Sequence, residues 1–135
     1  MAIMAIKMAN NKLDSLDGIG AASQGLGIVC NDVTWLDVSF NKIAKISDAI
    51  HCFPNLESLT LTNNCIESLK DLRVLRPLKK LHTIHLLGNP ICNSTAFGGS
   101  VKKYRKALIN MCPHLAKLDS AMVTKKEREL AQYKF

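Results

Sequence analysis

Few residues in this sequence are spaced for catalysis or for metal binding. His82 and His85 lie three positions apart, a spacing that on a strand sends two side chains to different sides, whereas structural zinc needs four convergent ligands. Acidic residues are scattered singly, and no nucleophile elbow, P-loop, dinucleotide-binding or metalloprotease motif occurs. Five cysteines form no CxxC pair: Cys30, Cys52, Cys65, Cys92 and Cys112. We therefore expect no enzyme, no cofactor and no metal site.

The cysteines and the hydropathy pattern also indicate a compartment. An odd number of cysteines without paired spacing argues against a disulfide framework, so we expect reduced thiols in the cytoplasm. No apolar run reaches the roughly 18 residues that span a bilayer, and the first residues lack the pattern of a secretory leader. Asn93-Ser94-Thr95, which fits a glycosylation acceptor, is then expected to be a polar loop.

The net charge of +7 is concentrated near the C-terminus, where residues 101–135 carry nine Lys and Arg against three Asp and Glu. The candidate basic surface consists of Lys102, Lys103, Arg105 and Lys106. One interpretation is a solvated helix face, and the other is a site for nucleic acid or for an acidic protein surface such as a tubulin tail. Only Tyr104 and Tyr133 place aromatic rings near these charges, which favours nucleic acid less.

A repeat organises most of the chain. Residues 33–43, VTWLDVSFNKI, have apolar side chains at positions one, four, six and eleven and asparagine at position nine. The pattern recurs at residues 56–66 and 81–91, and an earlier copy occupies residues 3–13, so successive copies start 30, 23 and 25 residues apart. A partial fifth unit follows at residues 115–119. A period of this length is the signature of a leucine-rich-repeat solenoid.

The repeat predicts an α/β fold. Positions four and six point to the same side of a short strand and form the core, while successive strands lie parallel in one curved sheet on the concave face. Apolar residues at helical spacing predict convex helices over residues 46–53 and 69–75, which end before Pro54 and Pro77. The longer first connection, which contains four glycines, is expected to be looser.

The repeats, about four units, are expected to occupy residues 1–92, and residues 93–135 should form a C-terminal cap over the apolar edge of the last coil. Ser100 is the expected N-cap of the first cap helix. The apolar side of that helix is expected to carry Val101, Tyr104, Leu108, Ile109 and Cys112. A last helical segment should begin at Val123.

The asparagine at position nine stands where the chain turns out of each strand and leaves backbone groups without a sheet partner. Its amide can donate and accept, so one asparagine per coil can satisfy those groups from coil to coil. The predicted structural ladder consists of Asn11, Asn41, Asn64 and Asn89.

Side chains that point away from the core form the candidate partner-binding face. The register places Leu36 and Val38 inward, so the lone tryptophan, Trp35, points outward. Phe40 is less informative, since an aromatic residue before the ladder asparagine can pack on neighbouring turns. The predicted concave-face residues are Trp35, Asp37, Phe40, Glu57, Thr60, Asn63, His82 and His85.

These repeats and the segments that follow them resemble the SDS22-like class of leucine-rich repeats with its C-terminal cap. The resemblance rests on Gly88-Asn89-Pro90, Tyr104-Arg105, Cys112-Pro113-His114-Leu115, Leu118-Asp119 and Val123-Thr124-Lys125-Lys126-Glu127-Arg128. The class includes a leucine-rich light chain of axonemal dynein, a phosphatase regulatory subunit, tubulin-folding cofactors and a splicing ribonucleoprotein subunit. The copy that starts at Ile3 departs from members with an N-terminal extension, so either the first coil is bare or the chain is shortened.

The resemblance implies a non-enzymatic protein that holds another macromolecule. Similarity within the class to a member from ciliated cells implies a scaffold or adaptor in the cytoplasm or the ciliary axoneme, with axonemal dynein, tubulin or another ciliary component as the protein partner. The alternatives are a ribonucleoprotein subunit, for which nucleic acid is a less favoured partner, and a phosphatase-regulatory protein. No catalytic residue transfers from the class, and no membrane partner is implied.

Overall fold

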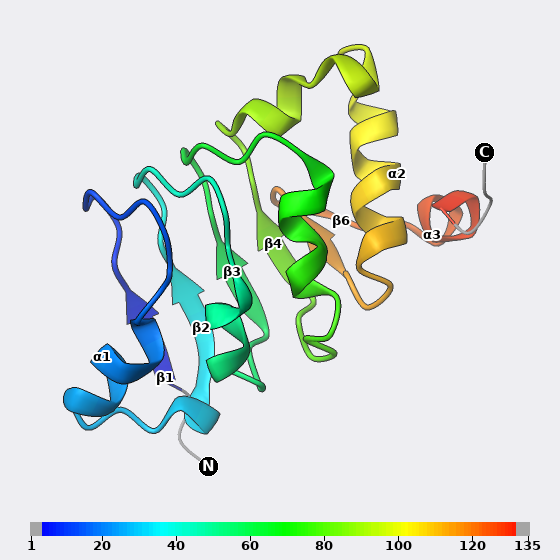
Figure 1. Cartoon of the computed structure of the whole chain (residues 1–135). Helices are drawn as coiled ribbons and strands as arrows, with labels where there is room; N and C mark the ends of the chain where they lie inside the picture. The colour runs from blue at the N-terminus through cyan, green and yellow to red at the C-terminus, as the bar shows by residue number, and fades with distance from the viewer. Residues whose placement is uncertain (1–3, 132–135) are drawn as a thin grey trace.

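The computed structural model describes residues 4–131, which form a row of stacked coils (Figure 1). Its six strands follow the order of the chain in a single sheet. The strands are β1 (Met4–Lys7), β2 (Val33–Asp37), β3 (Ser58–Thr60), β4 (Thr83–His85), β5 (Lys117–Leu118) and β6 (Ala121–Met122). The first five are parallel, as predicted, whereas β6 pairs antiparallel with β5 and ends the sheet. Ile3, the first position of the first repeat, lies outside the described residues.

Helical segments connect the strands and close the C-terminal end. The α-helices are α1 (Ile19–Gly25), α2 (Val101–Met111) and α3 (Lys125–Ala131). The 3₁₀ helices are η1 (Cys30–Asp32), η2 (Asp48–Cys52), η3 (Leu69–Leu75), η4 (Pro90–Asn93) and η5 (Thr95–Phe97). Between Met4 and Ala131, no helix is long and apolar enough to cross a bilayer.

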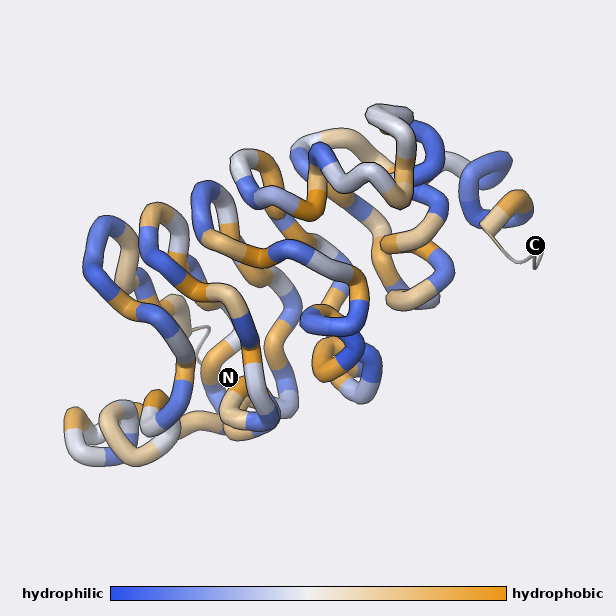
Figure 2. Tube along the Cα trace, turned by 45° about the horizontal axis from the view of Figure 1, so that its top comes forward, coloured by the Kyte–Doolittle hydropathy of each residue, from blue (hydrophilic) through white to orange (hydrophobic). Residues whose placement is uncertain are grey.

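The repeat register places one apolar side chain from each of the strands β2 to β5 in the same layer of the core. Leu36 pairs with Leu59, Leu59 with Ile84, and Ile84 with Leu118, and all four side chains are fully buried. Figure 2 shows the coils stacked side by side, with hydrophobic and hydrophilic residues alternating along each. The inward positions predicted from the repeat are therefore confirmed.

The convex segments predicted as helices over residues 46–53 and 69–75 are helical, and both are 3₁₀ helices. The first is confined to Asp48–Cys52, and the second spans Leu69–Leu75. A 3₁₀ helix rises further per residue than an α-helix, so it lets a short return segment cover the length of a strand. Both segments end before the prolines at 54 and 77, as expected.

The first connection is more ordered than its glycines suggested. It contains α1 and η1, and Ile19 of α1 is buried in the core. Gly18, which precedes α1, has φ of 80°, a left-handed conformation that glycine adopts without strain. The irregular parts of the first connection are thus the turns that enter and leave α1.

Candidate functional site

Three buried asparagines join the coils into a ladder: Asn41, Asn64 and Asn89. In the middle rung, the Nδ2 group of Asn64 donates to the carbonyl of Leu61 in its own coil (2.9 Å) and to that of Val38 in the preceding coil (3.1 Å). Its Oδ1 accepts a hydrogen bond from the amide of Ile43 (3.0 Å). The other two rungs bond to their own and the preceding coil in the same way.

Asn11 does not act as a rung, which corrects the fourth member of the predicted ladder. It is exposed, and within residues 4–131 its side chain donates only to the carbonyls of Met8 and Ala9 in its own turn. The physical reason is its place in the first coil, because each rung bonds to the coil before it and the structure describes none there.

Position eight, just before the position-nine asparagine, adopts a left-handed backbone in all four repeats. Its φ is 61° at Asn10, 57° at Phe40, 55° at Asn63 and 82° at Gly88. Asparagine and glycine tolerate this region, whereas a bulky aromatic residue does so only at a cost. A Cβ atom on Gly88 would lie 1.9 Å from Oδ1 of Asn63, so the Asn63 side chain occupies that space. Among the four position-eight residues, Phe40 is thus the one whose residue type disfavours the left-handed backbone conformation that it adopts.

The second repeat presents the largest apolar side chains of the concave face. Trp35 is 46% exposed and Phe40 is 53% exposed, so the Phe40 ring is not buried against neighbouring turns. The ammonium of Lys7 lies 5.9 Å from the Trp35 ring centroid. Between the two aromatic residues, Asp37 accepts hydrogen bonds from the amide and the hydroxyl of Ser39 (3.0 and 2.7 Å). The outward orientation of Trp35 agrees with the prediction.

The third and fourth repeats present a more polar surface. Thr60 and His85 are in register and half-buried, and Asn63 is exposed. Glu57 and His82 meet across the coils, with the carboxylate oxygen 3.5 Å from Nε2. No group of three or more histidine, cysteine, aspartate and glutamate side chains within residues 4–131 is placed to hold a metal ion.

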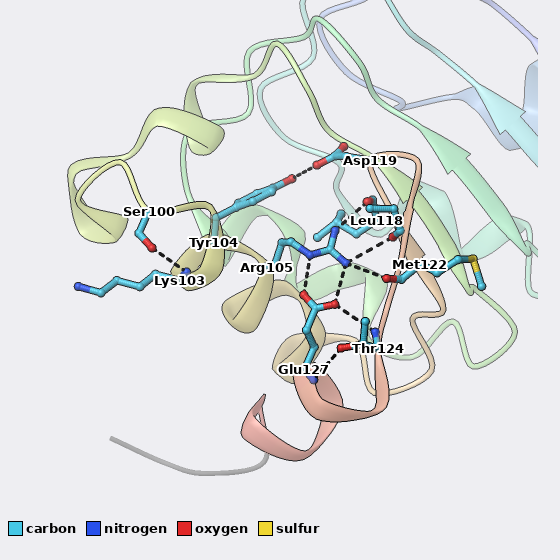
Figure 3. A network of polar contacts seen from close by, with 10 residues as sticks. Ser100, Lys103, Tyr104, Arg105, Leu118, Asp119, Met122, Thr124 and Glu127 are labelled. Carbon is cyan, nitrogen blue, oxygen red and sulfur yellow. Dashed lines mark hydrogen bonds and ion pairs between the residues drawn. The ribbon is translucent and has the colours of Figure 1, made fainter.

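The C-terminal cap is held by a network around Arg105 (Figure 3). Its guanidinium donates to both carboxylate oxygens of Glu127 in α3 (2.6 and 3.1 Å) and to the carbonyl of Leu118 in β5 (2.9 Å). This pairing lowers the pKa of Glu127 and raises that of Arg105. Thr124 and Glu127 also cap α3 reciprocally, since each side chain accepts from the other's amide. The network joins α2, α3 and the last strands.

Asp119 ends the hydrogen-bond pattern of the sheet, a role that the sequence analysis missed. In earlier coils, the Val38 and Leu61 amides donate to carbonyls of the next strand. The equivalent amide of Leu86 donates instead to Oδ1 of Asp119 (2.6 Å), and the Tyr104 hydroxyl donates to Oδ2 (2.7 Å). Burial and the Asp119 carboxylate raise the pKa of Tyr104. The sequence signal for this role of Asp119 was the pair Leu118-Asp119 at the end of the partial fifth repeat.

The structure separates the four residues of the predicted basic surface. Lys102 and Lys103 are exposed, and Lys106 is half-buried. Arg105 is corrected, because its side chain is only 12% exposed and its donors are engaged inside the cap. Val101 is corrected as well, since it is 69% exposed and does not belong to the apolar side of α2. Tyr133 lies outside the described residues.

Stacked coils, an asparagine ladder, an outward-facing sheet and a terminal cap define a leucine-rich-repeat protein. The chain belongs to the leucine-rich repeat family, whose model matches residues 3–135. This confirms the resemblance found in the sequence at the level of the family.

Among curated proteins, the chain is similar to leucine-rich repeat-containing protein 51 of Bos taurus, with 32% identity over 91% of the chain and 60% of that protein. It is also similar to human U2 small nuclear ribonucleoprotein A', with 31% identity over 97% of the chain and 46% of the relative. The chain therefore spans about half of the length of these relatives, 60% of the first and 46% of the second.

Among solved structures, the chain is similar to one in the Drosophila melanogaster SNF/U2A' complex. The TM-score is 0.77 and the identity 30%, over 95% of this chain and 66% of that one. A second structure, of Chaetomium Mex67:Mtr2 subunits, has a TM-score of 0.62 at 18% identity and shows the shared fold alone.

Proposed function

We propose that this chain is a non-enzymatic protein-binding module that holds one protein partner on its concave face, with Trp35 and Phe40 as the central contacts. The observation that carries the proposal is the pair of half-exposed aromatic side chains on one repeat of the sheet. Large rigid aromatic residues lose little side-chain entropy on binding and dominate the energetics of many protein interfaces.

The backbone at Phe40 supports this assignment independently. A left-handed backbone costs a bulky residue about 1–3 kcal/mol, and exposure of the ring means that core packing does not offset the cost. The same position holds asparagine or glycine in the other repeats. A contact with a partner gives a reason for phenylalanine there.

The proposed setting is a ciliary or axonemal adaptor, with an axonemal dynein subunit or tubulin as the first partners to test. This setting is what the resemblance to a class member from ciliated cells implies. We locate the adaptor in the cytoplasm and at the axoneme. The remaining concave residues that we assign to the interface are Asp37, Glu57, Thr60, Asn63, His82 and His85.

A second candidate function is that of a ribonucleoprotein subunit. The supporting observation is the similarity to the structure solved as the SNF/U2A' complex, at 30% identity and a TM-score of 0.77. In a ribonucleoprotein subunit, Lys102 and Lys103 of the basic surface would face an acidic partner or nucleic acid. Arg105 is engaged in the cap and is not assigned to either interface.

Affinity capture tests these functions against each other. Wild-type chain and the Trp35→Ala variant are used as baits in nuclease-treated lysates of ciliated and non-ciliated cells, followed by quantitative mass spectrometry. The adaptor function predicts axonemal proteins that bind wild type and are depleted with Trp35→Ala. Recovery of ribonucleoprotein components at equal levels with both baits would instead support the second function.

A further inference from the structure

The return segment of the third repeat, which contains η3 beside α2 (Figure 1), carries leucines and cations at a spacing of three residues. Leucine recurs at positions 69, 72, 75, 78 and 81. A cation follows each of the first four leucines, and we call these cations the cationic row: Lys70, Arg73, Arg76 and Lys79. Because a 3₁₀ helix has three residues per turn, side chains three residues apart eclipse one another along its surface.

The structure turns the leucines and the cationic row to different sides. The last four leucines are buried, whereas all four cations are exposed. The amides of Leu78 and Leu81 donate to the carbonyls of Leu75 and Leu78 (3.0 and 3.1 Å), so the three-residue spacing continues past the end of η3. The convex side of the third coil therefore presents a line of cations to solvent.

The charge of the cationic row is not balanced by its own segment. Residues 70–80 carry five Lys and Arg against a single acidic residue, Asp71. Asp71 is half-buried and accepts a hydrogen bond from the hydroxyl of Ser68 (3.1 Å). In the part of the chain between Met4 and Ala131, no side chain of the row forms an ion pair with a carboxylate. The row therefore contrasts with Arg105, whose charge is paired inside the cap.

The spacing of the cationic row fits an extended acidic chain. The Cα atoms of Lys70 and Arg76 are six residues apart and thus about 12 Å apart, at a rise of about 2.0 Å per residue. In an extended chain, every second side chain lies on the same face, and three such side chains span about 13 Å. Acidic residues at alternate positions of an extended segment would therefore meet one cation each.

Other anionic partners fit the row less well. Single-stranded nucleic acid is held largely by stacking of its bases on aromatic rings. Among residues 4–131, however, the large exposed aromatic side chains are Trp35 and Phe40 of the concave face. Segments that bind a membrane surface insert large apolar side chains beside their cations, and none of the exposed ones lies between residues 69 and 81. An acidic protein segment needs neither feature.

We propose that the cationic row is a docking site for an acidic segment of a partner protein, bound in an extended conformation with Glu or Asp at alternate positions. The 135 residues themselves do not supply such a segment. Glu127 and Glu129 are the only acidic residues two positions apart, and Glu127 is bound to Arg105. The site lies on the convex side, apart from the concave contacts of Trp35 and Phe40, so either site can fail without the other.

A synthetic acidic peptide is a direct probe of the site. The probe alternates glutamate with threonine, which favours an extended chain. Its matched control has the same composition with all glutamates consecutive. Fluorescence anisotropy at low ionic strength measures the Kd of each peptide for the 135-residue chain. We expect the alternating peptide to bind about threefold or more tightly, because its charges follow the spacing of the row.

Charge reversal locates the site on the chain. The row variant combines Lys70→Glu, Arg73→Glu and Lys79→Glu, all at exposed positions. The control variant changes the net charge equally and reverses three exposed lysines elsewhere: Lys12→Glu, Lys42→Glu and Lys45→Glu. We expect the row variant to weaken binding of the alternating peptide by about tenfold or more and the control variant by less than about threefold. Circular dichroism checks that both keep their fold, and a peptide that alternates lysine with threonine should bind the row variant.

Several results would overturn the proposal. Equal Kd values for the two acidic peptides, or equal losses in the two variants, would show that only net charge attracts the peptide. A folded row variant that does not bind the lysine peptide would also contradict it. Tighter binding of a uridine oligonucleotide or of phosphatidylserine vesicles, lost in the row variant, would assign the row to nucleic acid or to a membrane. Loss of peptide binding in the longest natural chain that contains this sequence would assign the row to a segment of that chain.

Discussion

The second repeat and the C-terminal cap both carry aromatic and charged side chains, but they use them differently. In the cap, Tyr104 is buried against Asp119, and the guanidinium of Arg105 is surrounded by protein acceptors. In the second repeat, Trp35 and Phe40 stand half in solvent. The same residue types therefore stabilise the fold in one region and remain available to a partner in the other.

Hydrogen-bond engagement therefore separates structural from binding residues better than residue type does. Basic residues in the C-terminal segment suggested an interaction surface, yet the most engaged of them, Arg105, links two helices to the sheet. Substitutions at engaged residues should therefore change stability, and substitutions at the exposed aromatic residues should change affinity.

The largest effect on stability is expected at Arg105. Substitution by alanine leaves Glu127 without its cation and removes donors from backbone carbonyls, so Arg105→Ala should lower the free energy of unfolding by about 2–3 kcal/mol. Urea denaturation measures this. Lys103→Ala, on the exposed side of the same helix, is the matched control and should change stability by less than about 0.5 kcal/mol. Equal effects of the two variants would refute the division within the cap.

The ladder predicts a contrast between two asparagines. Asn64→Ala strips partners from buried backbone groups and should cost about 1–3 kcal/mol, whereas Asn11→Ala removes only local bonds at an exposed turn and should cost about 0.5 kcal/mol or less. Thermal denaturation of both variants checks the difference. An unchanged melting temperature for Asn64→Ala would contradict the buried ladder.

The cap should also make the stability of the fold depend on pH in the acidic range. Because the pKa of Glu127 is lowered in the folded state, its stabilisation is fully present above the ordinary pKa of glutamate. It is lost as the pH falls through the lowered value. We expect a loss of about 1 kcal/mol from this pair on acidification, measured by denaturation between pH 6 and about pH 3. In the Glu127→Gln variant, this loss of stability on acidification should disappear. If the variant loses as much stability as the wild type, the loss belongs to other carboxylates.

A small effect on stability, of opposite sign, is expected at Phe40. Phe40→Asn relieves the left-handed backbone without removing a buried side chain, so it should stabilise the fold by about 0.5–1 kcal/mol. The same variant should bind the partner more weakly. A loss of stability, measured by urea denaturation, would show that the exposed ring contributes to packing after all.

The fold was largely predictable because the repeat links sequence to register directly. Once Leu36 was assigned inward, Trp35 had to face outward and Asn41 had to lie at the turn, as the structure shows. The 3₁₀ character of the return segments was not predictable, because apolar spacing over five to seven residues fits both helix types.

The contacts of the cap and the left-handed turn at Phe40 could not be predicted from the sequence, for a different reason. Arg105 is one of several basic residues in its segment, and only the approach of Glu127 from α3 distinguishes it from its neighbours. Likewise, the φ of 57° at Phe40 follows from the coil geometry rather than from the residue, since phenylalanine by itself disfavours that conformation. Long-range contacts of this kind leave no local pattern in the sequence.

The most direct test of the account is a binding isotherm of the captured partner at two salt concentrations. If the concave face is the interface, Trp35→Ala should weaken binding by about 2 kcal/mol, or roughly thirtyfold in Kd, at both concentrations, because the lost contact is apolar. Charge reversal at Lys102 and Lys103 should change mainly the association rate. A Kd that is unaffected by Trp35→Ala but rises steeply with salt would contradict the account and assign binding to the basic end.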